Sequence, residues 1–122
     1  MLNNHDFINA IYQDIEMVRG DTLAFNFTIK GLNGETPNIT FTCSEYYDGE
    51  VLFSCESGYG IEQVAYDSYN DITTFAVWVD PVKTKDLDLA RYYYDLELSV
   101  GDDVITLMRG RLTLVYDVTK GV

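Results

Sequence analysis

The sequence predicts an all-β domain, a two-sheet antiparallel β-sandwich of about seven or eight strands with one short helix. Segments of alternating apolar and polar residues recur roughly every ten residues. Two longer alternating runs, 91–100 and 104–118, flank the turn residues Gly101-Asp102-Asp103, which is the pattern of a β-hairpin. Only one stretch, 81–89, has a helical pattern, which is too little helix for a β-α-β architecture.

Length and composition indicate a single folded domain. The chain has 122 residues, 47% of them apolar and 14% aromatic, which is enough to bury a core without metal or disulfide support. Residues 1–11 have no clean periodicity and are expected to form an N-terminal arm. Residues 12–122 contain no linker or internal repeat, so we expect them to form a single β-sandwich domain.

The first half of the domain contains four expected strands, 12–18, 23–29, 39–43 and 51–55. In 23–29 every second residue is apolar, as in a half-buried strand. Pro37 stands just before the third strand, where its missing amide hydrogen does least harm.

Cys43 and Cys55 lie on the third and fourth expected strands, on either side of a turn near Gly49. If the turn is centred there, the two residues are equidistant from it and face each other. A disulfide is then geometrically possible. A cytosolic setting favours two reduced, buried thiols instead.

The second half begins with expected strands at 61–66 and 72–79, joined by a turn at 67–71 whose side chains can bond their own backbone. Apolar residues occur on both faces of 72–79, which suggests a strand that is covered on both sides. The helical stretch 81–89 is two turns at most, with Asp80 as a possible N-cap and Pro81 as the first helical residue.

The closing hairpin has two further features. Gly110 lies inside its return strand, where a bulge or bend is expected. Alternation in the first strand buries Tyr92 and Tyr94 and places Tyr93 on the other face, so these aromatic residues are expected to pack rather than bind a ligand.

The net charge of the chain excludes some classes of binding partner. The chain has 20 acidic and 8 basic residues, a net charge of −12 and a pI near 4.1. Phosphate backbones repel such a chain, so we expect neither nucleic acid nor an anionic membrane as a partner. No signal peptide or membrane-length apolar run is evident, and the protein is expected to be made and folded in a cytosol.

No catalytic, cofactor-binding or metal-binding residue is predicted, and the protein is expected not to be an enzyme. The only histidine, His5, lies in the expected arm, away from any nucleophile. Acidic pairs such as Asp86 and Asp88 lack the spacing of an EF-hand loop. A weak calcium site formed by separate loops remains open.

Two further sequence features allow a functional interpretation and a structural one. Arg19-Gly20-Asp21 is the tripeptide that integrins bind, but it also suits a turn in which Gly20 takes a backbone conformation that other residues resist. Tyrosines in the central region would form a carbohydrate-binding platform if they were exposed together. These are Tyr46, Tyr47, Tyr59, Tyr66 and Tyr69.

The segment Val18–Ile29 and the Gly31-Leu32-Asn33-Gly34 turn after it resemble the opening of small immunoglobulin-like β-sandwich modules of tailed-phage virion proteins. One relative is the N-terminal domain of the phage baseplate upper protein. Later segments are similar to the module's short helix and closing hairpin. They are 79–87, 92–98, 106–112 and 117–119.

This resemblance implies an immunoglobulin-like fold and a non-enzymatic structural role in a tailed-bacteriophage virion, after synthesis in the host bacterial cytoplasm. Expected partners are other virion proteins (capsid, neck, tail or fibre subunits), bound through the arm and a sheet edge, with several copies or a homo-oligomer in the particle. In the relatives the module usually begins a longer protein, whereas here the chain ends at Val122. That favours an adaptor, decoration, collar or baseplate/fibre-attachment subunit.

Two alternative functions remain from the sequence. The charge and small size allow an acidic inhibitor or DNA mimic that acts on a host defence enzyme, which would need carboxylates arrayed on one face. A carbohydrate-binding module would need the exposed tyrosine platform described above.

Overall fold

The computed structural model describes residues 11–46 and 48–116. The expected arm and His5 therefore lie almost entirely outside the described residues, although Ile11 already belongs to the first strand. The described part contains nine strands and one 3-10 turn. They are β1 (Ile11–Tyr12), β2 (Ile15–Val18), β3 (Leu23–Lys30), β4 (Asn38–Ser44), β5 (Val51–Ser57), β6 (Gly60–Asp67), β7 (Ile72–Val79), η2 (Pro81–Lys83), β8 (Arg91–Val100) and β9 (Asp103–Val115).

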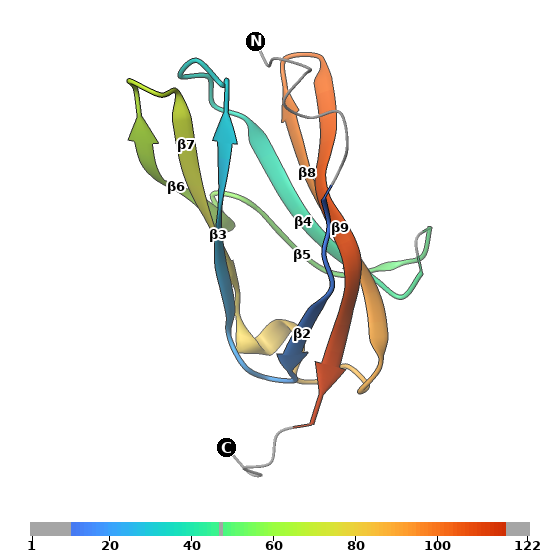
Figure 1. The fold of residues 1–122 in the computed structure, drawn as a ribbon. Helices are drawn as coiled ribbons and strands as arrows, with labels where there is room; N and C mark the ends of the chain where they lie inside the picture. Colours follow the sequence, from blue (N-terminus) through green and yellow to red (C-terminus); the bar gives the residue numbers. More distant parts are fainter. Residues whose placement is uncertain (1–10, 47, 117–122) are drawn as a thin grey trace.

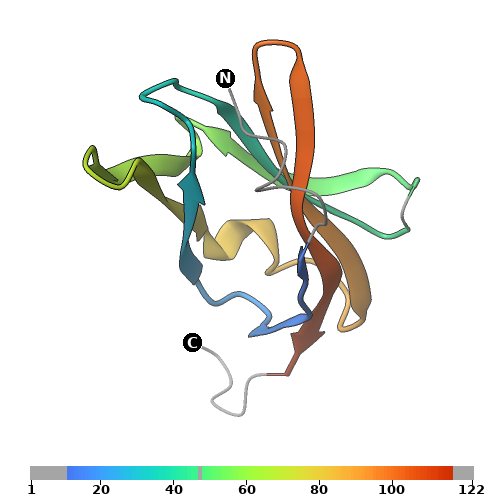
Figure 2. The same ribbon diagram turned by 45° about the horizontal axis from the view of Figure 1, so that its top comes forward.

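The strands form one curled sheet in the order β1-β9-β8-β4-β5-β6-β7-β3, with β2 also paired to β9 (Figure 1). The sheet folds over between β5 and β6, which pair over only two residue pairs. As a result β3, β6 and β7 lie on one side of the core and β4, β8 and β9 on the other (Figure 2). The all-β prediction is confirmed.

The core lies between these two halves and is held by aromatic contacts across it. Phe41 of β4 is fully buried, and its ring centroid lies 5.9 Å from that of Phe25 on β3, a strand of the opposite half. The same ring lies 5.3 Å from that of Tyr94 on the neighbouring strand β8. Phe41 therefore joins the two halves at the centre of the molecule.

Strand pairing differs from the prediction in two respects. The expected strand 12–18 is two short strands, interrupted at Gln13 and Asp14, which raises the strand number to nine. Both pair in parallel with β9, and β5 pairs in parallel with β6, so the sheet is mixed rather than antiparallel throughout. Parallel pairing of β9 with residues about a hundred positions earlier has no local signal in the sequence.

The expected helix at 81–89 is wrong in length, because only Pro81–Lys83 form a single 3-10 turn. Pro81 does occupy its first turn, but Asp80 makes no capping hydrogen bond. Its carboxylate instead accepts a bond of 2.9 Å from the indole nitrogen of Trp78. A side-chain partner outside the turn thus replaces the expected cap.

Strand β7 is covered on one face, and the expectation of two covered faces was wrong. Thr73, Phe75, Val77 and Val79 are buried, whereas Trp78 on the opposite face is 53% exposed. Apolar composition on both faces did not reveal this, because an exposed tryptophan and a buried one look alike in sequence.

The closing hairpin is present as β8 and β9, with Tyr92 and Tyr94 buried as predicted. Its bulge is not at Gly110 but at Leu107, where the pairing shifts between Leu96 and Glu97. Gly110 is needed for a different reason, the close approach of a neighbouring segment. A Cβ atom on it would lie 2.2 Å from the backbone oxygen of Gln13, so only glycine allows the segment between β1 and β2 to approach β9.

The cysteines do not face each other. Cys43 pairs with Phe53, and Cys55 pairs with Phe41, because the strand pairs are centred near Asp48 rather than Gly49. Both cysteines are free and buried, so the interpretation as reduced thiols is confirmed.

We expect both thiols to be unreactive in the folded protein. Burial raises the pKa of the Cys43 thiol to about 12, and burial also raises the pKa of Cys55. Since the thiolate is the reactive form, a disulfide reagent at roughly pH 8 should modify neither thiol in the native protein and both after denaturation. Absorbance of the released thiolate measures this, and rapid native modification would contradict the burial of these side chains.

Candidate functional site

The Arg19-Gly20-Asp21 segment is a structural turn. Gly20 has a φ of +83°, and its amide donates to the hydroxyl of the fully buried Thr84, at 2.9 Å. The guanidinium of Arg19 donates to the backbone oxygen of Leu87. The segment therefore ties the start of β3 to the loop after η2, and Arg19 is engaged inside the molecule rather than presented to a receptor.

The proposed loop calcium site has no support in the described residues. Within 11–46 and 48–116, no group of three or more histidine, cysteine, aspartate or glutamate side chains is placed to hold a metal ion. The acidic turn 67–71 instead bonds its own backbone, as predicted, with Asp67 accepting from the amides of Tyr69 and Asn70.

No helix among the described residues has the length and apolar character to cross a membrane.

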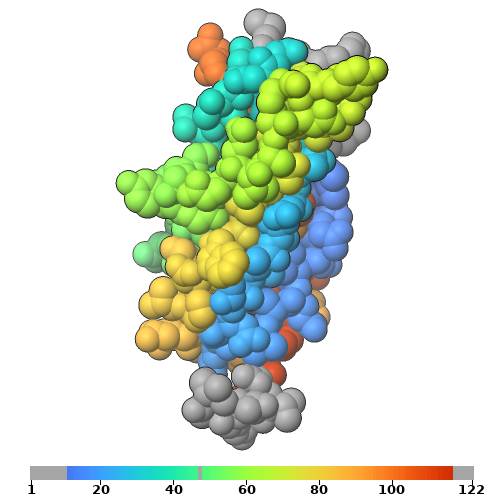
Figure 3. All heavy atoms as spheres, turned by 90° about the vertical axis from the view of Figure 1, so that its left-hand side faces the viewer, coloured from blue at the N-terminus to red at the C-terminus, as the bar shows by residue number. Residues whose placement is uncertain are grey.

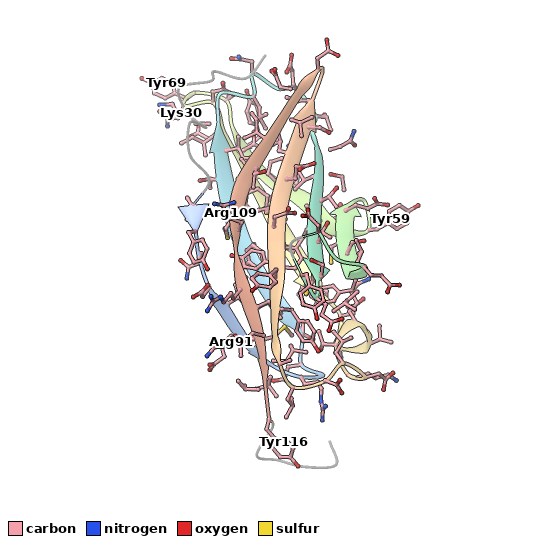
Figure 4. The ribbon with its side chains drawn as sticks, turned by 90° about the vertical axis from the view of Figure 1, so that its right-hand side faces the viewer. Lys30, Tyr59, Tyr69, Arg91, Arg109 and Tyr116 are labelled. Carbon is pink, nitrogen blue, oxygen red and sulfur yellow. The ribbon has the colours of Figure 1, made fainter. Side chains whose placement is uncertain are left out.

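The tyrosine platform is divided between separate parts of the surface. Tyr47 lies outside the described residues, and the other four tyrosines are exposed. Tyr59 is at the corner between β5 and β6, whereas Tyr69 is at the turn between β6 and β7, and Figure 4 shows them projecting from different sides of the molecule. They do not form one continuous aromatic surface.

The sequence prediction missed an exposed tryptophan. Trp78 lies on the outer face of β3, β6 and β7, which Figure 3 shows as one side of the molecule. Opposite it on β3 is Ala24, and the next cross-strand pair is Asn26 with Ala76. The hydrogen bond to Asp80 holds the indole in place.

A second candidate surface lies on the outer face of β2, β9 and β8, where three arginines gather. The strand register places Arg109 between Tyr12 and Asp95, and Arg111 opposite Tyr93. Arg91 lies opposite Thr113, whose partner on β2 is Glu16. We call Tyr12, Asp14, Glu16, Arg91, Tyr93, Asp95, Arg109, Arg111 and Thr113 the arginine face.

The arginine face contains a shallow pocket of about 330 Å³. Its lining combines both signs of charge with a hydroxyl group. The residues are Asp14, Ile15, Glu16, Arg91, Arg111 and Thr113. One carboxylate is fixed in place, since Asp14 accepts from the backbone amide of Arg111 at 3.0 Å.

The arginine side chains of this face are exposed and available. Within the part of the chain that the structure describes, no ion pair engages Arg91, Arg109 or Arg111. Asp95 lies opposite Arg109 on the neighbouring strand, yet burial raises the pKa of its carboxyl and no nearby cation lowers it. Arg109 itself is exposed.

The sheet also has open edges. The outer side of β9 is covered by β1 and β2, except at Asp103–Leu107, so most of the closing hairpin is not free to pair. At the other end of the strand order, β3 pairs with β7 over eight consecutive residue pairs without a bulge. No other described strand pairs with β3, and its only charged residue is Lys30.

Comparisons with known proteins identify a fold but no family. No protein-family model matches the chain, and no curated protein does. Among solved structures, a family 123 glycoside hydrolase from Clostridium perfringens, analysed for glycolipid glycan hydrolysis, is similar with a TM-score of 0.55 and 11% identity. The similarity covers 89% of this chain but only 24% of the enzyme, so this chain spans about a quarter of that protein. Identity this low shows a shared fold alone.

Proposed function

We propose that the chain is a non-enzymatic structural protein of a tailed-bacteriophage particle, an adaptor, decoration, collar or baseplate subunit that acts through protein-protein contacts. Two segments that carry the sequence resemblance, 18–29 and 79–87, are joined by the hydrogen bonds of Arg19 and Gly20 to Leu87 and Thr84. Residues that resemble the phage module therefore have a common structural task, which supports a similar immunoglobulin-like arrangement here.

The observation that carries the proposal is the open edge of β3. Long, regular edge strands pair with other chains unless bulges, prolines or charges guard them. Strand β6, whose pairing with β5 covers only two residue pairs, has a register shift at Val64 and carries Glu62 and Asp67. Strand β3, in contrast, has no bulge, no proline and one terminal lysine. An unguarded strand of eight residues suits a subunit that adds a strand to, or receives one from, a neighbour.

A deletion in the phage genome tests this function. Removing the coding sequence should give particles that lack an appendage or fail to complete assembly, and expression of the protein in trans should restore them. Electron microscopy and plaque counts measure both effects. Particles of normal morphology and infectivity without the protein would argue for a role outside the virion.

Carbohydrate binding is a second candidate, favoured by the exposed and anchored Trp78. Sugars stack on aromatic faces, and the similarity to part of a glycoside hydrolase makes a glycan a reasonable ligand to test. If this candidate is correct, glycan-array binding should fall about tenfold or more in Trp78→Ala. The matched variant Tyr69→Ala, which removes another exposed aromatic ring, should bind as the wild type does. Equal losses in both variants would contradict a site at Trp78.

The alternative of an acidic inhibitor or DNA mimic rests on the net charge of −12. A mimic needs carboxylates on one face at phosphate-like spacing. The acidic residues of this chain fall on strands of both halves of the sheet and in turns at both ends, for example Glu62, Glu97, Asp86 and Asp102. That distribution favours assembly over mimicry.

A further inference from the structure

The arginine face differs in charge from the rest of the chain. The whole chain carries 20 acidic and 8 basic residues. On this face three arginines stand among three carboxylates, those of Asp14, Glu16 and Asp95. The exposed Glu97 follows Asp95 on the same side of β8 and adds a fourth carboxylate at its margin. The face is therefore close to balanced in charge, whereas the chain as a whole is strongly acidic.

The charges on this face alternate in space. Arg109 and Arg111 are two residues apart on β9, about 7 Å along the strand, and point to the same side. Arg91 on β8 is diagonal to Arg111 across the strand pair. Glu16 lies in the same cross-strand row as Arg91, with Thr113 between them. Figure 4 shows Arg91 and Arg109 along the same hairpin.

We propose that the arginine face is the contact surface between two copies of this chain, in an isologous dimer related by a two-fold axis. Arginines of one copy face Asp14 and Glu16 of the other, and the same contacts recur on the opposite side of the axis. A twofold contact requires a self-complementary surface, and arginines and carboxylates side by side on one face provide it. The proposal does not depend on a role in a phage particle.

Repulsion between two acidic chains favours this face as the place where a second copy binds. Two chains of charge −12 repel each other, so they approach with least cost where the local charge is balanced. A nucleic acid is disfavoured as the occupant, because Asp14 and Glu16 in the pocket would face its phosphates. A polypeptide surface carrying both signs of charge satisfies the arginines and the carboxylates together.

The composition of the face also suits a protein contact. Arginine and tyrosine are enriched among the residues that dominate binding energy at protein interfaces. Tyr12 is 54% exposed beside Arg109, and Tyr93 lies opposite Arg111. The pocket between Arg91 and Arg111 gives a concave site for a partner side chain.

Sedimentation velocity of the full chain over a concentration series tests the proposal. Wild-type protein should dimerise reversibly, and Arg91→Glu with Arg109→Glu should raise the dimer dissociation constant about tenfold or more, since each charge reversal acts twice in an isologous interface. The matched control is Lys30→Glu with Lys85→Glu, which makes the same change in net charge at exposed positions outside this face. The control should change the constant less than about threefold.

Two results would overturn the proposal. One is a wild-type protein that stays monomeric at the highest concentration measured. The other is a dimer that both double variants weaken equally, which would indicate general repulsion or a contact elsewhere. Circular dichroism melting confirms that each variant is folded, and Arg91→Gln with Arg109→Gln replaces the reversed pair if reversal impairs folding.

Discussion

Phe41→Ala should lower the free energy of unfolding by about 3 to 5 kcal/mol, the range for removing a large, fully buried aromatic side chain. Phe41 has no exposed surface, and its ring is 5.9 Å from that of Phe25, 5.3 Å from that of Tyr94 and 6.3 Å from that of Phe53. Since Phe25 belongs to the opposite half of the sheet, the substitution leaves a cavity between the two halves that neither can close alone.

Chemical denaturation followed by tryptophan fluorescence measures the loss in Phe41→Ala. The control is Tyr69→Ala, which removes an aromatic ring that is 93% exposed and should change stability by less than about 0.5 kcal/mol. A Phe41→Ala variant as stable as this control would show that the two halves do not pack through this ring.

Gly110→Ala should destabilise the fold by about 3 kcal/mol, at the upper end of the usual range for overpacking. The new methyl group would lie 2.2 Å from the backbone oxygen of Gln13. That oxygen also accepts a hydrogen bond from the hydroxyl of Tyr94, and the Gln13 amide donates to Arg109 at 2.9 Å. Because the obstacle is backbone, the clash forces β1 and β2 away from β9.

Hydrogen exchange separates this local effect from a general one. In Gly110→Ala the amides of β2 should lose protection before those of β4 and β8, since β2 depends on its pairing with β9. Gly101→Ala is the control: no atom lies within 4 Å of its added methyl group, and its φ of +57° costs only about 1 to 2 kcal/mol. Unchanged protection of β2 in Gly110→Ala would contradict the close approach of Gln13.

Elements with a strong local pattern could be predicted from the sequence. The strand expected at 23–29 is observed at Leu23–Lys30, and the hairpin around Gly101 and Asp102 is present with Tyr92 and Tyr94 buried. In both cases a period of two residues and a turn sequence determine the outcome locally. These signals established the all-β class.

Features that depend on distant contacts could not be predicted. Parallel pairing of β1 and β2 with β9 joins residues near the two ends of the chain, and no local pattern encodes it. The expected facing of the two cysteines was wrong because a hairpin centred one residue before Gly49 moves every cross-strand partner by two positions. The steric need for glycine at position 110 likewise comes from the backbone of Gln13, which is far away in sequence.

The arginine face was missed, although part of its signal was present in the sequence. Alternation along the return strand puts Arg109 and Arg111 on one face. A hairpin centred on the turn at 101–102 would place Met108 opposite Asp95, and the bulge at Leu107 is needed to bring Arg109 there. What the sequence lacked was the third strand, β2, which brings Asp14 and Glu16 beside them. The balance of charge therefore appears only in the folded protein.

The central claim is that this chain is a structural subunit of a tailed-phage particle, and quantitative mass spectrometry of purified particles tests it most directly. The account predicts that the chain copurifies with infectious particles through a density gradient at a fixed ratio to the major capsid protein. Abundance in infected cells together with absence from purified particles would contradict it.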